Sequence, residues 1–431
     1  MDNLMEFLRF SDPTLRVVTG GTVFISVSAA IVGCFAFLRK RSLVGDAIAH
    51  AILPGIALAF ILFQTKNPLY LLGGALLSGW LAMLSIDQIK IHSKLPTDTA
   101  IALVLSVFFG IGILLLTYIQ HQGSGNQAGL DQFLFGKAAS MTRQDLWTYC
   151  IVAALLLLAV VLLYKELMLY SFNPDFAQAS GLPVKFLRFA LNLITVTAIA
   201  IGIQSVGVVL MAALLITPAA AARSWTNRLN LMILVAALLG ALSGMVGSYV
   251  SFSAPAMPTG PWIVMSLSVL AMLSLIVAPR RGLLARYVRQ KQNREKIVNE
   301  NVLKLFYQIG EDRKSLQPTV KKEELGARRD FRGPELEMAL KRLLKNHLIL
   351  RQGEAYKLSR QGLDEARRVV RLHRLWEMYL SRRLRLKADH IHPNAETMEH
   401  IITPEIEEQL LRELDYPKKD PHLSPIPYSH E

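Results

Sequence analysis

The chain has little cysteine, no phosphate-binding loop and, over its first 279 residues, little charge. Cys34 and Cys150 are the only cysteines, and both lie in apolar runs, which argues against a disulfide framework or a cysteine zinc site. No GxxxxGKS or GxxxxGKT sequence occurs, so the motif of an ATPase is missing. Residues 1–16 lack the order of a cleavable signal peptide, and no nucleophile lies beside a base in a recognisable motif. We therefore do not expect an enzyme, and any ATP hydrolysis is expected in another subunit.

The distribution of charge divides the chain near residue 280. Residues 1–279 hold 15 Lys and Arg and 10 Asp and Glu, whereas the shorter remainder holds 32 and 23. Apolar stretches recur in the first part, each near the roughly 20 residues that cross a bilayer as a helix. They predict an all-α polytopic membrane protein of about eight or nine transmembrane helices, with GIQSVG (202–207) either a tight turn or a break in one irregular helix. The expected spans are 17–38, 48–64, 69–87, 99–119, 146–164, 187–203, 206–222, 229–250 and 261–278.

Most of the basic residues of the first part fall in alternate connections between these spans. By the positive-inside rule, this pattern places the N-terminus outside and the C-terminal part in the cytoplasm. The stretch HQGSGNQAG, in one of the opposite connections, contains no Lys or Arg. We therefore predict a multi-pass protein of the bacterial inner membrane, with its inner connections marked by Arg39/Lys40/Arg41, Lys90/Lys94, Lys165/Lys185/Arg188, Arg223/Arg228 and Arg280/Arg281.

Two ionisable residues lie together at the start of the second expected span. Asp46 and His50 are four residues apart in GDAIAHAILPG, so a helix presents both side chains on one face. A carboxylate and an imidazole are suitable ligands for a divalent cation, and ionisable groups within a membrane mark functional sites. Pro54 lacks an N–H and frees the carbonyl oxygen of His50, which then needs another partner, such as a metal ion or water. The alternative is a hydrogen-bonded pair that only fixes helix packing.

The part after residue 280 has the composition of a soluble region. Its first residues form a basic connector, which is expected to contact anionic membrane lipids. Three expected helices and a hairpin that turns at Gly353 then follow in the order of a winged helix, and a longer helix begins after Ser359. The predicted segments are a transmembrane domain (1–279), a linker (280–299), a winged helix (300–358) and a helical metal-binding and dimerisation-like domain (359–431).

Histidine and glutamate residues gather in the last of these segments. His373 and Glu377 are one helical turn apart, and the same spacing separates Glu396 from His400. Glu399 precedes His400, and His392 lies just before this cluster. Two such helices would enclose manganese or iron with six ligands, or zinc with fewer. A solvated amphipathic helix explains one such cluster, but two clusters favour a metal site.

Four stretches of the first part occur in a characteristic order: LRKRSLVGDAIAHAILPGIALAF, QFLFGKAASMTRQDL, NPDFAQASGLPV and VGVVLMAALLITPAAAARSW. Over residues 15–280 they resemble the permease subunits of ABC-type uptake systems for manganese, zinc and iron. This resemblance implies that Asp46 and His50 lie on the metal path. It also implies that Asp175, Ala179 and Gly181 belong to the loop that couples transport to the ATPase. The implied partners are a cytoplasmic ATPase, an extracytoplasmic metal-binding protein and a second permease, either a copy or a related chain.

Three stretches of the tail, KLSRQGLDEARRVVRLHRLWEMYL, HPNAETMEHIITPEIEEQL and YPKKDPHLSPIP, are similar to another family. Over residues 295–427 they resemble the iron- and manganese-dependent repressors of the diphtheria-toxin-repressor family. The resemblance assigns Asn301 and Lys304 to positions of metal ligands, and protonated Lys does not bind a metal, so the second site departs from the family there. The two implied metal sites are His373, Glu377 and His392, and Glu396, Glu399 and His400.

DNA is not an expected partner of the tail. In RGPELEMALKRLLK, Glu335 and Glu337 begin the helix that would approach bases and phosphates, and acidic side chains repel the DNA backbone. The basic surplus of the tail fits a membrane surface equally well.

The leading hypothesis is the permease subunit of an ABC importer for a divalent transition metal, with a tail that senses the metal. Manganese is the first candidate and zinc and iron are the others, because histidine and carboxylate ligands accommodate all three. Two alternatives stay open: a secondary metal carrier that uses Asp46 for protons, and a membrane-tethered metal-dependent transcription regulator.

Overall fold

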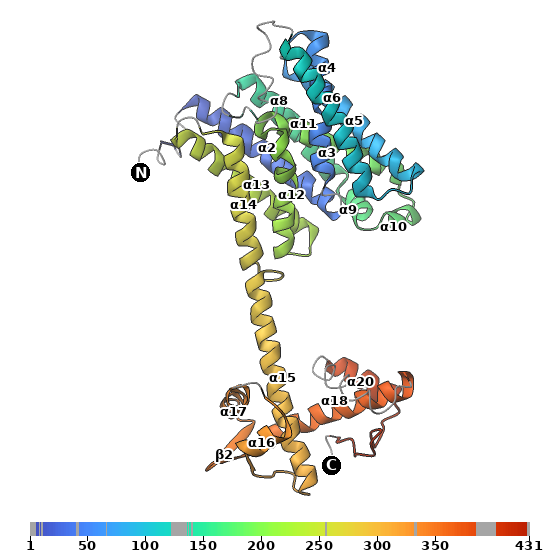
Figure 1. Cartoon of the computed structure of the whole chain (residues 1–431), viewed down its shortest axis with the longest axis vertical. Coiled ribbons are helices and arrows are strands. Elements are labelled where there is room, and N and C mark those ends of the chain that lie inside the picture. The colour runs from blue at the N-terminus through green and yellow to red at the C-terminus, as the bar shows by residue number, and fades with distance from the viewer. Residues whose placement is uncertain are drawn as a thin grey trace. The chain divides into compact units, whose positions relative to one another are not determined.

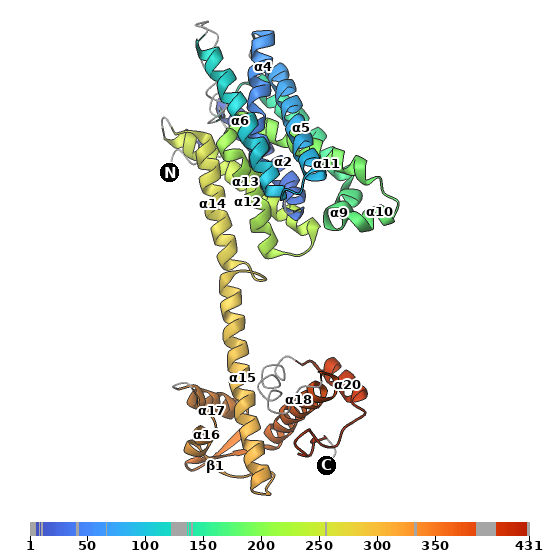
Figure 2. The ribbon, with the colours of Figure 1, turned by 45° about the vertical axis from the view of Figure 1, so that its right-hand side comes forward.

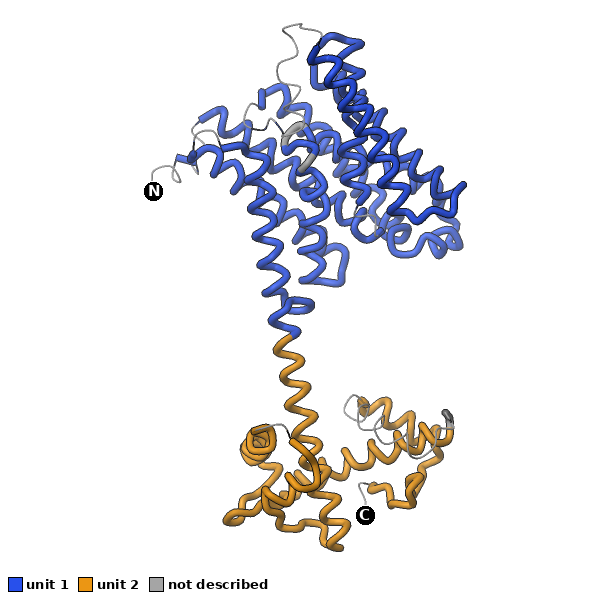
Figure 3. The backbone as a smooth tube through the Cα atoms, in the orientation of Figure 1, with its two compact units in different colours: residues 1–286 blue, residues 287–431 orange. Residues whose placement is uncertain are grey.

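The chain is mostly helical and divides into two compact units, residues 1–286 and 287–431 (Figure 3). The computed structural model describes residues 6, 7, 9, 12–39, 43–65, 67–121, 136, 138, 141–254, 257–331, 334–384 and 402–428. The first unit contains α2 (Pro13–Leu38), α3 (Val44–Ala51), α4 (Leu53–Phe63), α5 (Pro68–His92), α6 (Thr97–His121), α8 (Arg143–Leu162), α9 (Tyr164–Phe172), α10 (Pro174–Ala179), α11 (Val184–Val206), α12 (Val208–Trp225), α13 (Leu229–Ser253) and α14 (Thr259–Val277) (Figure 1).

Capping residues explain where several of these helices begin. The side chain of Asp12 accepts a hydrogen bond from the N–H of Thr14 at 2.7 Å, and Pro13 occupies the first turn of α2, where its missing N–H costs nothing. At the start of α8, Thr142 and Asp145 form a reciprocal capping box. These caps replace the hydrogen bonds that the first N–H groups of a helix lack, so the apolar segments begin at defined residues.

Eight helical segments among the described residues are long and apolar enough to cross a membrane. One of them, Val44–Phe63, combines α3 and α4. The expected span at 206–222 is found as α12, whose described apolar part, Leu210–Trp225, is shorter than the others. This result confirms a mostly helical protein with many candidate spans.

The chain reverses between α11 and α12 instead of continuing as one irregular helix. Gly207 separates the two helices with φ of +91°, a conformation that glycine adopts easily. A Cβ atom at Gly202 would lie 2.2 Å from the sulfur of Met211. In a straight helix these two residues would be about 13 Å apart along the axis. The chain therefore makes a tight turn at Gly207, and the preceding residues 202–206 of GIQSVG still belong to α11.

Helix α2 supplies much of the core of the first unit and packs against α8, α11, α12 and α13 (Figure 1; Figure 2 shows the same helices turned by 45°). Glycines permit its closest approach to α13. A Cβ atom at Gly240 would lie 2.7 Å from the carbonyl oxygen of Ser26, and one at Gly244 would lie 3.1 Å from the Cα of Val23. The small residues thus bring two membrane-spanning helices into main-chain contact.

The second unit has a core built from helices and a small antiparallel sheet. Helix α15 (Leu283–Asp312) contributes Val302, Phe306 and Ile309 to this core. The strands lie in the order β1-β3-β2, and the hairpin turns at Gly353 as the sequence predicts, with Ile349 opposite Leu358. The elements are α16 (Lys322–Arg328), α17 (Glu335–Lys345), β1 (Val320–Lys321), β2 (Ile349–Gln352), β3 (Ala355–Leu358), α18 (Arg360–Leu384) and α20 (Pro404–Glu413).

A buried arginine joins three segments of the second unit. Arg374 of α18 donates hydrogen bonds to both carboxylate oxygens of Glu311, at 2.9 and 2.6 Å, and lies 3.6 Å from Asp420. Burial disfavours the charged guanidinium, but the hydrogen bonds to Glu311 and the charges of Glu311 and Asp420 raise the pKa of Arg374 overall. The cation therefore stays charged and ties α15, α18 and the C-terminal segment together.

Candidate functional site

The predicted ligand pair lies on the short helix α3. His50 Nε2 is 3.6 Å from Asp46 Oδ1, so the two side chains share one helix face as their spacing predicts. On the single chain 42% of the Asp46 side chain and 18% of the His50 side chain are exposed. The ring of Phe109 on α6 packs edge-on against the imidazole, with the centroids 4.7 Å apart. The pair therefore offers two potential metal ligands: a carboxylate oxygen of Asp46 and a ring nitrogen of His50. The contact with Phe109 restrains the imidazole ring.

The helix is interrupted directly after this pair. Helix α3 ends at Ala51, and Pro54 lies in the first turn of α4. The N–H of Ile52 donates to the carbonyl of Ile48 at 3.0 Å, and Pro54 has no N–H to offer the carbonyl of His50. The next carbonyl group, that of Ala51, has a side-chain donor. The hydroxyl of Ser78 donates a hydrogen bond to its oxygen at 2.6 Å. Sequence reasoning missed Ser78 and Phe109, since neither lies in a recognisable motif.

The residues of the expected coupling loop lie on and after helix α10. The side chain of Asn173 caps this helix by accepting the N–H of Phe176 at 3.0 Å, and Asp175 lies in its first turn. After Ala179 the chain turns through Gly181, whose φ of +80° disfavours other residues. Helices α9 and α10 pack together at one end of the first unit (Figure 2). The aromatic ring of Phe176 is exposed, so this segment presents a short capped helix with an apolar side chain at the surface.

The first predicted ligands of the tail form a buried pair on α18. His373 Nε2 lies 3.1 Å from Glu377 Oε1, and both side chains are almost completely enclosed. His392, Glu396, Glu399 and His400 lie outside the described residues. Asn301 and Lys304 are buried on α15. Within the described ranges, no three His, Cys, Asp or Glu side chains come close enough to hold a metal ion.

The acidic start of α17 is bound by basic residues of its own unit. Glu335 forms an ion pair with Arg294 of α15. Glu337 lies 2.9 Å from Lys341 and 3.3 Å from Lys322, and the hydrogen bonds from these two lysines lower the pKa of Glu337. These ion pairs link α17 to α15 and α16. They also neutralise part of the positive charge of Arg294, Lys322 and Lys341.

Many apolar spans, with an ionisable pair inside one of them, are typical of a polytopic membrane protein. The family model described as the ABC 3 transport family matches residues 11–278, and the metal-binding and dimerisation domain of iron-dependent repressors matches residues 359–428. The chain belongs to the ABC 3 transport family. It is a multi-pass membrane permease, a transport component without catalytic activity, that carries a C-terminal domain of the iron-dependent repressor type.

Individual relatives agree with this assignment. The manganese transport system membrane protein MntC of Bacillus subtilis is 40% identical over 88% of this chain and 87% of its own length. The zinc transport system membrane protein TroC of Treponema pallidum is 42% identical over 66% of this chain and 95% of its own length. Among solved structures, PsaBC from Streptococcus pneumoniae in complex with Fab matches with a TM-score of 0.59 and 32% identity, covering 67% of this chain and 99% of that one. These matches confirm the predicted membrane permease of an ABC import system.

Proposed function

We propose that the chain imports a divalent transition metal, with manganese as the first candidate substrate and zinc and iron as the others. The observation that carries the proposal is the Asp46 and His50 pair, which lies 3.6 Å apart on one face of an apolar span. Oxygen and nitrogen ligands suit all three metals. The relatives from Bacillus subtilis and Treponema pallidum are named for manganese and zinc transport, and these names support this substrate class.

A second permease, either another copy or a related chain, completes the metal site in this proposal. Asp46 and His50 supply two ligands, whereas these metals take about four to six. The exposure of Asp46 on the single chain supports the addition of ligands from outside it.

The proposed complex also contains a cytoplasmic ATPase and an extracytoplasmic metal-binding protein. The ATPase docks on Asp175, Ala179 and Gly181, and the exposed ring of Phe176 supports a docking role for this segment. In this proposal α12 crosses the membrane as a ninth span, which places the N-terminus outside and the tail in the cytoplasm of a bacterial cell. The alternating basic connections support that orientation.

Transport assays in vesicles test this function. The full-length chain is reconstituted with its ATPase and metal-binding protein, and manganese, zinc and iron uptake is measured with and without ATP. We expect ATP-dependent uptake of manganese. Uptake that needs no ATPase and follows a proton gradient would identify a secondary carrier instead.

Replacing Gly181 by Ala tests the proposed coupling loop. A non-glycine residue at φ of +80° costs about 1 to 2 kcal/mol, so the turn after α10 is expected to shift. We expect the number of metal ions imported per ATP hydrolysed to fall several-fold. Gly110→Ala is the control, because a Cβ at that helical glycine meets no atom within 4 Å. Equal coupling in both variants would count against this loop.

We further propose that the tail consists of a linker (280–299), a winged helix (300–358) and a metal-sensing domain (359–431). The three helices and antiparallel sheet of the second unit support the winged helix. The proposed sensor ligands are His373, Glu377, His392, Glu396, Glu399 and His400. The buried contact between the first two supports a pair that is already arranged for a metal.

Removing His373 or Glu399 is expected to abolish feedback of cytosolic metal on uptake. Metal regulates only if it binds one state of the tail better than another, and loss of a ligand removes that difference. We expect His373→Ala and Glu399→Ala to keep the basal uptake rate but to lose its decrease at high internal manganese. His347→Asn is the control, since φ of +56° at this turn tolerates Asn. Unchanged regulation in both ligand variants would refute metal sensing by the tail.

A further inference from the structure

The start of α4, directly after α3, is packed tightly between α5 and α6. A Cβ atom at Gly55 would lie 2.1 Å from the carbonyl oxygen of Gly74, so α4 and α5 touch through their main chains. On the other side, a Cβ at Gly112 of α6 would lie 2.8 Å from the Cβ of Leu53. Only glycine permits such close approach. The interruption between α3 and α4 therefore lies between two closely packed helices.

Ser78 provides a specific hydrogen bond within this contact. Its hydroxyl donates to the carbonyl oxygen of Ala51 at 2.6 Å. Ala51 is the last residue of α3, and carbonyls in the last turn of a helix lack a donor from their own helix. Ser78 thus satisfies a main-chain oxygen that the interrupted helix leaves without its usual partner.

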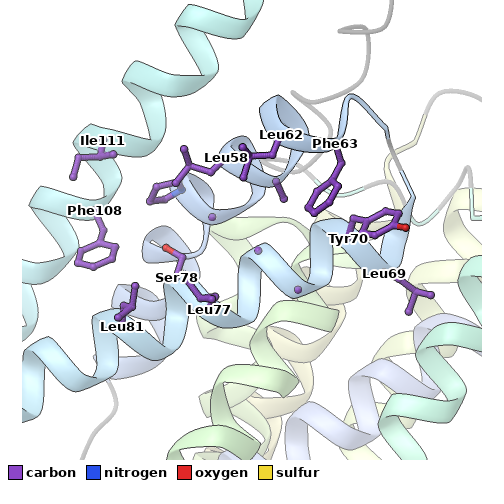
Figure 4. Close-up of a pocket in the computed structure, with 15 residues that line it drawn as sticks. Leu58, Leu62, Phe63, Leu69, Tyr70, Leu77, Ser78, Leu81, Phe108 and Ile111 are labelled. Atoms are coloured by element: carbon purple, nitrogen blue, oxygen red, sulfur yellow. The ribbon is translucent and has the colours of Figure 1, made fainter.

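The surroundings of Ser78 favour this bond. Ser78 lines a hollow of about 580 Å³ between α4, α5 and α6, and apart from Tyr70 its neighbours there have apolar side chains (Figure 4). In an apolar environment an unpaired carbonyl is costly, because no solvent replaces the lost donor. The bond from Ser78 to Ala51 is therefore expected to persist.

We propose that Ser78 is a positioning residue for metal transport, because its hydroxyl fixes the end of α3 and thereby the direction of the His50 side chain. The proposal rests on the function proposed above for Asp46 and His50. His50 directly precedes Ala51, so a rotation of the peptide that Ser78 holds also turns the backbone that carries the imidazole. Metal ligands must be held to within about 0.5 Å of their productive geometry, and Phe109 restrains the same ring from α6.

The test compares Ser78→Ala with Ser85→Ala in the reconstituted full-length transporter. Ser85 is a matched control, because it lies on α5 and donates to the carbonyl of Leu81 at 2.8 Å, but on the exposed side. We expect the half-saturating manganese concentration of Ser78→Ala to rise about tenfold, with little change in the maximal rate. Ser78→Cys keeps a weak donor of similar size and is expected to be intermediate.

Metal preference separates positioning from a general loss of folded protein. A displaced imidazole alters the ligand geometry, so Ser78→Ala is expected to change the preference for manganese over zinc. A folding defect lowers the maximal rate for both metals alike. Equal half-saturation and equal preference in Ser78→Ala and Ser85→Ala would overturn the proposal. Failure of both Ser78 variants to accumulate in the membrane would also overturn it, since the hydroxyl would then serve folding alone.

Asp46→Asn, measured in parallel, distinguishes this inference from the proposed function. Unaltered uptake in Asp46→Asn refutes the metal path and the positioning role together. Lost uptake in Asp46→Asn, combined with normal affinity and preference in Ser78→Ala, refutes only the positioning role.

Discussion

Asp46→Asn and His50→Ala are each expected to reduce ATP-dependent metal uptake severely, and both variants are expected to fold and reach the membrane. Asn keeps the shape of Asp but removes the charge that attracts a cation, and Ala removes the imidazole nitrogen. Loss of a partner that only orients a metal ligand costs roughly 10- to 100-fold in affinity. We therefore expect loss of a direct ligand to reduce uptake at limiting metal by about a hundredfold or more.

The measurement is initial uptake into vesicles at several manganese concentrations, with transporter amounts matched. Asp98→Asn is the control, because this exposed carboxylate lies in the first turn of α6 and has no part in the proposed path. Metal-independent ATP hydrolysis of the complex is expected to survive in all three variants. Normal uptake by Asp46→Asn and His50→Ala would remove the basis of the proposed metal path.

Gly74→Ala is expected to cause a large loss of stability, whereas the neighbouring Gly73→Ala is not. A Cβ atom at Gly74 would lie 2.2 Å from the carbonyl oxygen of Gly55 and 2.8 Å from the Cβ of Ala59. The obstacle includes main chain, which cannot rotate away as a flexible side chain does. Overpacking of this kind costs about 2 to 3 kcal/mol. We expect a clear decrease in the thermal unfolding temperature of the detergent-solubilised protein.

The adjacent glycine offers an internal comparison for that result. A Cβ at Gly73 meets no atom within 4 Å, so Ala fits without displacing a neighbour. Because glycine inside a helix costs about 0.5 to 1 kcal/mol relative to alanine, Gly73→Ala is expected to leave stability unchanged or slightly raised. If both variants lost stability equally, the close contact between α4 and α5 would not be the cause.

Features that depend on residues adjacent in the sequence could be predicted from the sequence alone. Apolar stretches predicted the positions of the spans, and Gly353 predicted the hairpin turn. The helix after Ser359 also begins where expected, as α18. Each of these depends on local composition, capping or backbone preference, which the sequence displays directly.

Contacts between distant residues could not be predicted in the same way. Ser78 and Ala51 are 27 residues apart, and nothing in the sequence marks one serine of α5 as the partner of that carbonyl. Glu335 was expected only to repel DNA, but it forms an ion pair with Arg294, which is 41 residues away. Such pairs depend on how helices pack, which a single sequence does not specify.

The ion pairs of α15 determine where the tail can be separated from the membrane part as an intact fragment. Arg294 binds Glu335, and Glu295 lies 3.5 Å from Arg342, so residues before position 300 hold α17 in place. A fragment that starts at residue 300 loses these contacts and also Val298, which packs against the apolar core. A fragment that starts at residue 287 retains both, and it is the better choice for expression, crystallisation and metal titration of the isolated tail.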